Sequence, residues 1–176
     1  VFVLTQNILY THGARIEGLS IVFTQPDSSN IADLTHYPVA ININGASRAE
    51  IKSVNIWDAW DGISAKGTFN GVTYVPDCSG WRLQNVAMTA YHIGIDQDGS
   101  WDTIVIDGFH FHFSNHDWGQ SPATVTQKSS IFTDNAIAIR TGKGDDIKIS
   151  NSILAGFKAL SAGVGAIGAG AYVSVS

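Results

Sequence analysis

The chain has 176 residues, of which 44% are hydrophobic and only 14% are charged, and its formal net charge is −5. So few charged residues argue against a helical protein, whose outer faces would need lysine, arginine and glutamate, and with 18 glycines they favour a turn-rich β protein. The negative charge argues against a nucleic-acid partner, no apolar run reaches the roughly 20 residues needed for membrane insertion, and the single Cys78 can form neither an internal disulfide nor a thiolate zinc site.

Five segments along the chain repeat the pattern apolar–x–x–apolar–x–apolar. In chain order they begin at Ile16, Ile51, Leu83, Ile106 and Ile149. The starts are separated by 35, 32, 23 and 43 residues. The shortest interval fits one coil of a parallel β-helix, and the longer intervals fit a coil with an inserted loop. We expect these insertions where Pro, Gly and Ser collect, near residues 24–37, 64–80 and 114–133.

A small or turn-prone residue precedes the middle apolar position of every unit. These residues are Gly18, Ser53, Asn85, Gly108 and Asn151. Gly and Asn tolerate a positive φ best, so we expect a sharp bend between two short strands at each position. Further short strands are predicted upstream of four units, at residues 39–43, 72–75, 92–95 and 136–139.

One such coil cannot bury its own apolar face, whereas stacked coils with parallel strands about 4.8 Å apart share a continuous interior. The sequence therefore predicts an all-β fold, a right-handed single-stranded parallel β-helix (a solenoid) of about 5–7 coils. We expect residues 1–176 to form a single domain that is a segment of a longer chain. A β-sandwich is the structural alternative, but its hairpin turns are missing, because Asn70-Gly71 and Asp98-Gly99 fall in loops between units.

Three segments resemble coils of the pectate-lyase-like β-helix proteins, most of all those of bacteriophage tailspikes and capsule depolymerases. They are "ARIEGLSIVF" (14–23), "RAEIKSVNIWDAWDGI" (48–63) and "WRLQNVAMTAYHIGI" (81–95). The resemblance, which covers most of residues 14–157, implies an extracellular homotrimer on a virion tail. Its implied partner is a bacterial capsular, O-antigen or exopolysaccharide, which such proteins bind and often cleave. The family has no invariant motif to transfer, so the site is predicted from the residues themselves.

Strand alternation in "FHFHF" (109–113) directs Phe109 and Phe111 inward and His110 and His112 outward. Aligning the units, on the assumption of no bulge, places aromatic, acidic and histidine side chains on one outer surface. The members of this surface are Trp57, Asp58, Trp60, Asp61, Tyr91, His92, His112, His116, Asp117 and Trp118. Aromatic rings stack on the C–H faces of sugars, and carboxylates bind their hydroxyls, so this surface is predicted to bind a polysaccharide.

Paired carboxylates about 5–9.5 Å apart can hydrolyse a glycosidic bond. Asp58 or Asp61 is the predicted acid or base, Asp96 is the predicted second carboxylate, and His112 is predicted to transfer a proton or orient the sugar. The predicted substrate-binding residues are Trp57, Trp60, Tyr91, His92, Trp101, His116, Asp117 and Trp118. Elimination at a uronate is the chemical variant, but it needs a Lys or Arg that these outward columns lack.

Simpler interpretations stay open for each of these features. The histidines can be a solvated strand face, the tryptophans can be covered by a loop or a second subunit, and Asp98 and Asp102 can be turn residues. No metal or cofactor is predicted. The spacing of His112, His116 and Asp117 differs from familiar zinc motifs, and no acid follows the glycine pattern of 163–168. The alternative functions are a non-catalytic glycan-binding or structural spike and a secreted, monomeric, calcium-dependent polysaccharide lyase.

Overall fold

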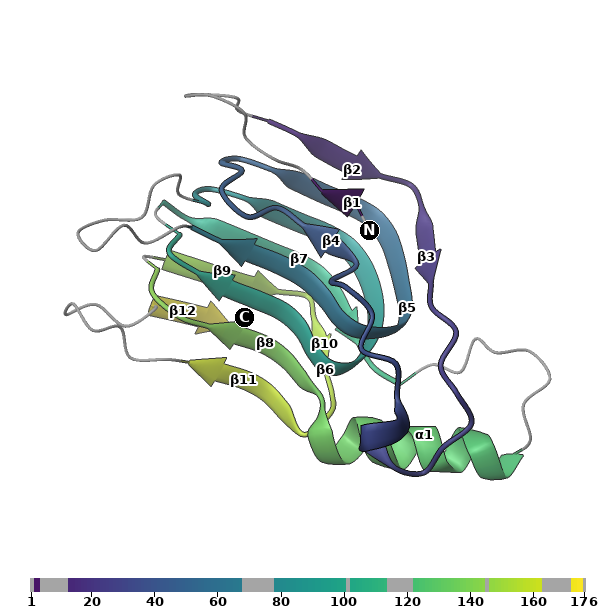
Figure 1. Cartoon of the computed structure of the whole chain (residues 1–176). Coiled ribbons are helices and arrows are strands. Elements are labelled where there is room, and N and C mark those ends of the chain that lie inside the picture. Colours follow the sequence, from purple (N-terminus) through teal and green to yellow (C-terminus); the bar gives the residue numbers. More distant parts are fainter. Residues whose placement is uncertain are drawn as a thin grey trace.

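The computed structural model describes residues 2–3, 13–67, 78–100, 102–113, 122–144, 146–162 and 172–175. Most of these residues belong to one 12-stranded sheet that curls into a half-barrel (Figure 1). Every strand pair within it is parallel. The fold is therefore mostly β, and its continuous parallel pairing does not fit a sandwich of antiparallel hairpins.

The strands are β1 (Phe2–Val3), β2 (Arg15–Glu17), β3 (Ser20–Val22), β4 (Ile41–Asn42), β5 (Glu50–Lys66), β6 (Arg82–Asp98), β7 (Ile104–Phe111), β8 (Ile137–Thr141), β9 (Asp146–Ser150), β10 (Ile153–Leu154), β11 (Lys158–Ala162) and β12 (Tyr172–Val175). A 3-10 turn, η1 (Ile31–Asp33), lies between β3 and β4, and one helix, α1 (Pro122–Asn135), lies between β7 and β8. Among the described residues, no helix combines the length and apolar character needed to cross a membrane.

The two 17-residue strands β5 and β6 set the shape of the sheet, because each bends midway and so has two arms. The first arm of β5 pairs with β2 and β3, and its second arm pairs with β4. The first arm of β6 pairs with β7, and its second arm pairs with β8. The apolar interior therefore lies between two facing arms.

The register of the first arms confirms the repeat that the sequence predicts. The five unit starts pair in succession: Ile16 with Ile51, Ile51 with Leu83, Leu83 with Ile106, and Ile106 with Ile149. The predicted bends are also confirmed, since all five have positive φ: 70° at Gly18, 52° at Ser53, 51° at Asn85, 66° at Gly108 and 50° at Asn151. The repeat spacing and its turn residues thus determine how successive strands align.

The strands predicted upstream of the units form the second arms. Ile41 pairs with Ile63, Ile63 with Ile95, and Ile95 with Ile139. The predicted strand 72–75 lies outside the described residues.

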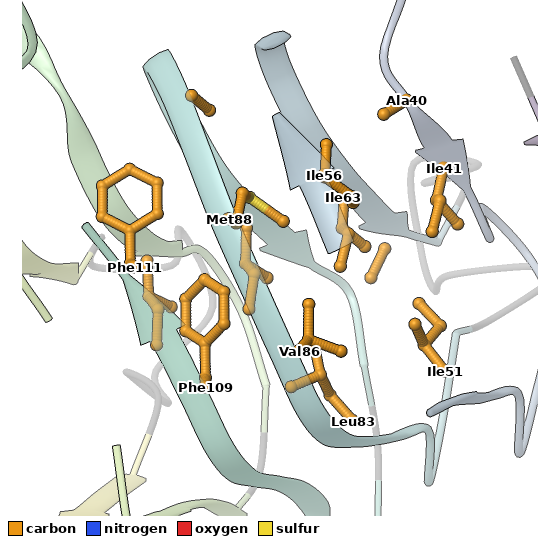
Figure 2. Close-up of a cluster of buried hydrophobic side chains, with 14 of the residues drawn as sticks. Ala40, Ile41, Ile51, Ile56, Ile63, Leu83, Val86, Met88, Phe109 and Phe111 are labelled. Atoms are coloured by element: carbon orange, nitrogen blue, oxygen red, sulfur yellow. The ribbon is translucent and has the colours of Figure 1, made fainter. Parts of the chain in front are cut away.

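Buried side chains from both arms fill the interior in rows that cross the strands (Figure 2). One row contains Ile56, Met88 and Phe111, which are register partners and are 0% exposed. A second row contains Val54, Val86 and Phe109, which are at most 1% exposed. Because apolar burial contributes about 25 cal/mol per Å², these rows are the main source of stability for the sheet.

The helix α1 differs from the loop predicted near 114–133, and it makes the fold mostly β rather than all β. Pro122 stands at its first position, where proline suits a helix start because the N–H that proline lacks would have no helical acceptor there. Lys128, Ile131 and Phe132 are buried, and their i, i+3, i+4 spacing is the helical signal that the sequence analysis missed. The Phe132 ring packs 5.1 Å from that of Phe111.

Candidate functional site

The pairing of β5 with β6 contains two register shifts at the bend. The alignment of the repeat units assumed that no such shift was present. Ala59 pairs with Ala90 instead of Tyr91, and the register returns where Asp61 pairs with Ile93. Each strand therefore contributes one extra residue at the bend, as in a β-bulge. A bulge breaks the alternation of inward and outward side chains, so residues near the bend cannot be assigned to a face by counting.

Asp58 and Tyr91 lie inside the bend, and their predicted place on the outer surface is wrong. Asp58 has a φ of 58° and is 1% exposed, and Tyr91 is 0% exposed. The Tyr91 hydroxyl donates a 2.8 Å hydrogen bond to Asp58 Oδ1, and Gln25 Nε2 donates a 3.0 Å bond to the Asp58 carbonyl. Lys128 Nζ of α1 donates to the Gln25 carbonyl at 3.3 Å. These buried polar groups hold the bend together and have no surface to offer a polysaccharide.

Four side chains gather on the outer face just after the bend, and we call them the Trp60 cluster: His36, Trp60, Asp61 and His92. The indole of Trp60 is stacked with His36 at 3.7 Å and 17°, and with His92 at 5.1 Å and 21°. His92 Nδ1 lies 2.8 Å from Asp61 Oδ1. Because a carboxylate only accepts, Nδ1 carries the hydrogen, and Nε2 of the neutral ring is left as an acceptor.

The structure thus brings together three residues predicted for the site, Trp60, Asp61 and His92, and adds one that was missed. His36 belongs to the insertion between β3 and β4 and is exposed. No periodic pattern surrounds it, so only the tertiary fold reveals that it reaches Trp60. The Asp61 and His92 side chains are 35% and 43% exposed, so a ligand in solvent can reach both.

A second aromatic pair lies before the bend. The rings of Trp57 and His112 meet edge to face at 6.0 Å on either side of the buried Thr89. The Thr89 hydroxyl donates a 2.7 Å hydrogen bond to the His112 carbonyl. His112 Nδ1 lies 3.1 Å from the Phe113 carbonyl, so it donates there and Nε2 remains an acceptor. Trp57 and His112 are partly exposed, whereas Thr89, predicted to face outward with them, is buried.

Asp96 is held by two cations of the second arms. Arg140 Nε donates to Oδ1 at 2.8 Å, Arg140 Nη2 donates to Oδ2 at 2.5 Å, and Lys66 Nζ pairs with Oδ2. Burial alone would raise the pKa of Asp96, but the hydrogen bonds and charges of Arg140 and Lys66 outweigh it and lower the pKa below 3.8. Asp96 therefore remains a carboxylate and is a poor proton donor.

The pairing of Asp96 with Asp58 or Asp61 as catalytic carboxylates stays a prediction. Asp58 is buried, and Asp61 lies three residues before Ser64, the register partner of Asp96. Three residues correspond to about 10 Å between Cα atoms along a strand. Arg140 lies beside Asp96 in the second arms, outside the outward columns that the sequence predicts to lack Lys and Arg.

We expect Asp96→Asn to lower the free energy of unfolding by about 1–2 kcal/mol at neutral pH, because both cations lose their carboxylate. The lowered pKa means that, as the pH falls, the unfolded chain binds the Asp96 proton before the folded chain does. The stabilisation is therefore complete well above pH 3.8 and is lost as the pH falls below it. Urea unfolding of both proteins at about pH 7 and about pH 3 measures this difference.

The exposed Asp27→Asn is the matched control, since Asp27 makes no ion pair among the described residues, and it should change stability by less than about 0.5 kcal/mol. An Asp96→Asn effect of equal size at both pH values would contradict the assignment.

Four predicted substrate-binding residues, Trp101, His116, Asp117 and Trp118, lie outside the described residues. Within the described part of the chain, no group of three or more His, Cys, Asp or Glu residues is arranged to hold a metal ion. Comparison with known families, curated proteins and solved structures found no match for this chain.

Proposed function

We propose that this chain is a segment of a right-handed parallel β-helix protein, similar to a phage tailspike, that binds a bacterial surface polysaccharide on its outer face. The observation that carries this proposal is the Trp60 cluster, in which stacked rings and a carboxylate stand together on a rigid sheet. The in-register repeat units and bends support the β-helix as the finer description of the curled sheet. A homotrimeric, extracellular assembly on a virion tail belongs to the same proposal.

The chemistry of the cluster suits a sugar. A pyranose presents a face of C–H groups that stacks on an indole, and the indole of Trp60 already stacks with the planar rings of His36 and His92. Asp61 accepts hydrogen bonds from hydroxyls through the oxygen that does not contact His92. The long arms of β5 and β6 hold these groups in fixed positions, so little ordering entropy is lost on binding.

We expect Trp60→Ala to weaken binding of the cognate polysaccharide about tenfold or more, because the stacking surface is lost. The cognate glycan is first found by titrating the wild type against a panel of capsular, O-antigen and exopolysaccharides. Trp60→Phe keeps a ring and should retain most of the affinity. Phe157→Ala removes an aromatic ring that is 57% exposed elsewhere and should change affinity by less than about twofold. Equal affinity of Trp60→Ala and wild type would contradict the proposal.

A second candidate function is cleavage by elimination, which the hydrogen bond between Asp61 and His92 favours. Asp61 orients His92 so that Nε2 can take the proton next to the carboxylate of a uronate. The electron pair of that C–H bond forms a carbon–carbon double bond, and the glycosidic oxygen leaves and takes up a proton from water. Elimination also needs a cation beside the uronate carboxylate, and Arg140 of the neighbouring second arm is the proposed one.

Incubation with acidic polysaccharides distinguishes elimination from binding alone. Elimination gives products that absorb in the ultraviolet and are lighter by one water than hydrolytic products, and His92→Gln should abolish them while binding persists. Intact polysaccharide after incubation with the wild type favours the non-catalytic spike.

A further inference from the structure

A cleft of about 620 Å³ lies at the other end of the first arms, where β5, β6 and β7 begin. It is lined by Arg48, Glu50, Gly80, Arg82, Asp102 and Thr103. The Trp60 cluster, by contrast, lies beyond the bend of β5. The cleft is therefore a separate site from the one described above.

The backbone keeps this cleft open. Arg48, Gly80 and Asp102 have φ values of 54°, 62° and 62°, so three neighbouring corners adopt the left-handed conformation. A Cβ at Gly80 would lie 3.5 Å from Arg48 Cγ and 3.9 Å from Asp102 Cβ, so a side chain there would fill the space between them. Left-handed backbone at a residue other than glycine costs about 1–2 kcal/mol, and such strain clusters at ligand sites.

Two arginines and two carboxylates line the cleft, on a chain whose net charge is −5. Arg82 is exposed, and in the part of the chain that the structure describes neither Arg48 nor Arg82 forms an ion pair. Glu50 lies between Arg15 on β2 and Arg82 on β6. Its carboxylate pairs with Arg15 at 3.3 Å. Two guanidinium groups thus line the cleft without an ion pair among the described residues, and their planar forks match carboxylates.

We propose that the cleft binds the carboxylate of an acidic sugar unit, a uronate or a related sugar acid of a polysaccharide. Arg48 and Arg82 hold the carboxylate, while Thr103 and Asp102 bind the hydroxyls of the same sugar ring. The choice of a saccharide rests on the proposed function. The inference adds a substrate class, acidic glycans, and a second contact point along the polysaccharide chain.

Titration of the protein with trigalacturonate, observed through the Nε–H signals of its arginines by NMR, tests the cleft directly. We expect the signals of Arg48 and Arg82 to shift, with little change on titration with the neutral maltotriose or with inorganic sulfate. Arg82→Gln should weaken trigalacturonate binding about tenfold or more. Gly80→Asn should have a similar effect, because Asn tolerates positive φ and fills the cleft.

Lys148→Gln is the matched control, because it removes one cation of the same outward column outside the cleft. An equal loss of affinity in Lys148→Gln, an equal response to sulfate alone, or unchanged binding by Arg48→Gln/Arg82→Gln would overturn the assignment. In Trp60→Ala, trigalacturonate should still shift the Arg48 and Arg82 signals. The proposal for the cleft and the proposal for the Trp60 cluster can therefore be contradicted separately. Thermal unfolding of each variant verifies that the fold is retained.

Discussion

Replacing Phe111 by alanine is expected to lower the free energy of unfolding by about 3–5 kcal/mol, a large part of the stability of a typical domain. Phe111 is 0% exposed, and its ring packs 5.9 Å from that of Phe109 and 5.1 Å from that of Phe132 on α1. Truncation removes the buried packing contacts of the ring and leaves a cavity where the two arms and the helix meet. Equilibrium unfolding in guanidinium chloride measures the loss.

Phe157→Ala is the same chemical change at a side chain that is 57% exposed and has a cation–π contact to Lys158 at 5.4 Å. It should cost about 1 kcal/mol or less. Similar costs for the two variants would mean that Phe111 does not occupy the interior described above.

Replacing Gly94 by alanine is expected to destabilise the fold by about 3 kcal/mol through overpacking. A Cβ at Gly94 would lie 2.6 Å from the Ala138 carbonyl oxygen and 2.7 Å from a ring carbon of Phe111. Since β6 and β8 are paired on both sides of this point, the carbonyl cannot retreat without breaking strand pairing. The same unfolding experiment measures the effect.

Gly18→Ala separates steric crowding from backbone strain. Apart from its two chain neighbours, no described residue has an atom within 4 Å of a Cβ at Gly18. Its φ is 70°, so the variant carries only the cost of a left-handed alanine, about 1–2 kcal/mol. If Gly18→Ala proved more harmful than Gly94→Ala, the close approach of the second arms would be refuted.

The repeat units could be predicted from the sequence because their signals are local. Apolar residues at fixed spacing and a Gly, Asn or Ser before the middle position specify strand, bend and strand. The register then follows, since burying each apolar row requires Ile51 to meet Leu83 and Val54 to meet Val86. The prediction of inward Phe109 and Phe111 succeeded for the same reason.

The face of each residue near the bend could not be predicted, because a bulge leaves no local signal. The extra residue at the bend turns Asp58 inward, and its polar side chain would by itself suggest an exposed position. Tyr91 is buried beside Asp58 and donates a hydrogen bond to its carboxylate.

The partners of the outer-face residues depend on distant parts of the chain. Arg140 lies 44 residues from Asp96 and meets it only because β6 and β8 pair in register. His36 reaches Trp60 from an insertion without any periodic pattern. Such contacts appear only once the arms of the sheet are assembled.

The in-register stacking of the units is best tested by a single distance between Ser20 and Ile153, which lie on the outer face four strand steps apart. Spin labels on cysteines at these positions, in a Cys78→Ser background diluted with unlabelled protein, report this distance by pulsed electron paramagnetic resonance. Stacked parallel strands give a narrow distribution centred at about 20 Å, four times the strand spacing. A broad distribution, or one centred beyond about 30 Å, would contradict the stacking and the outer face built on it.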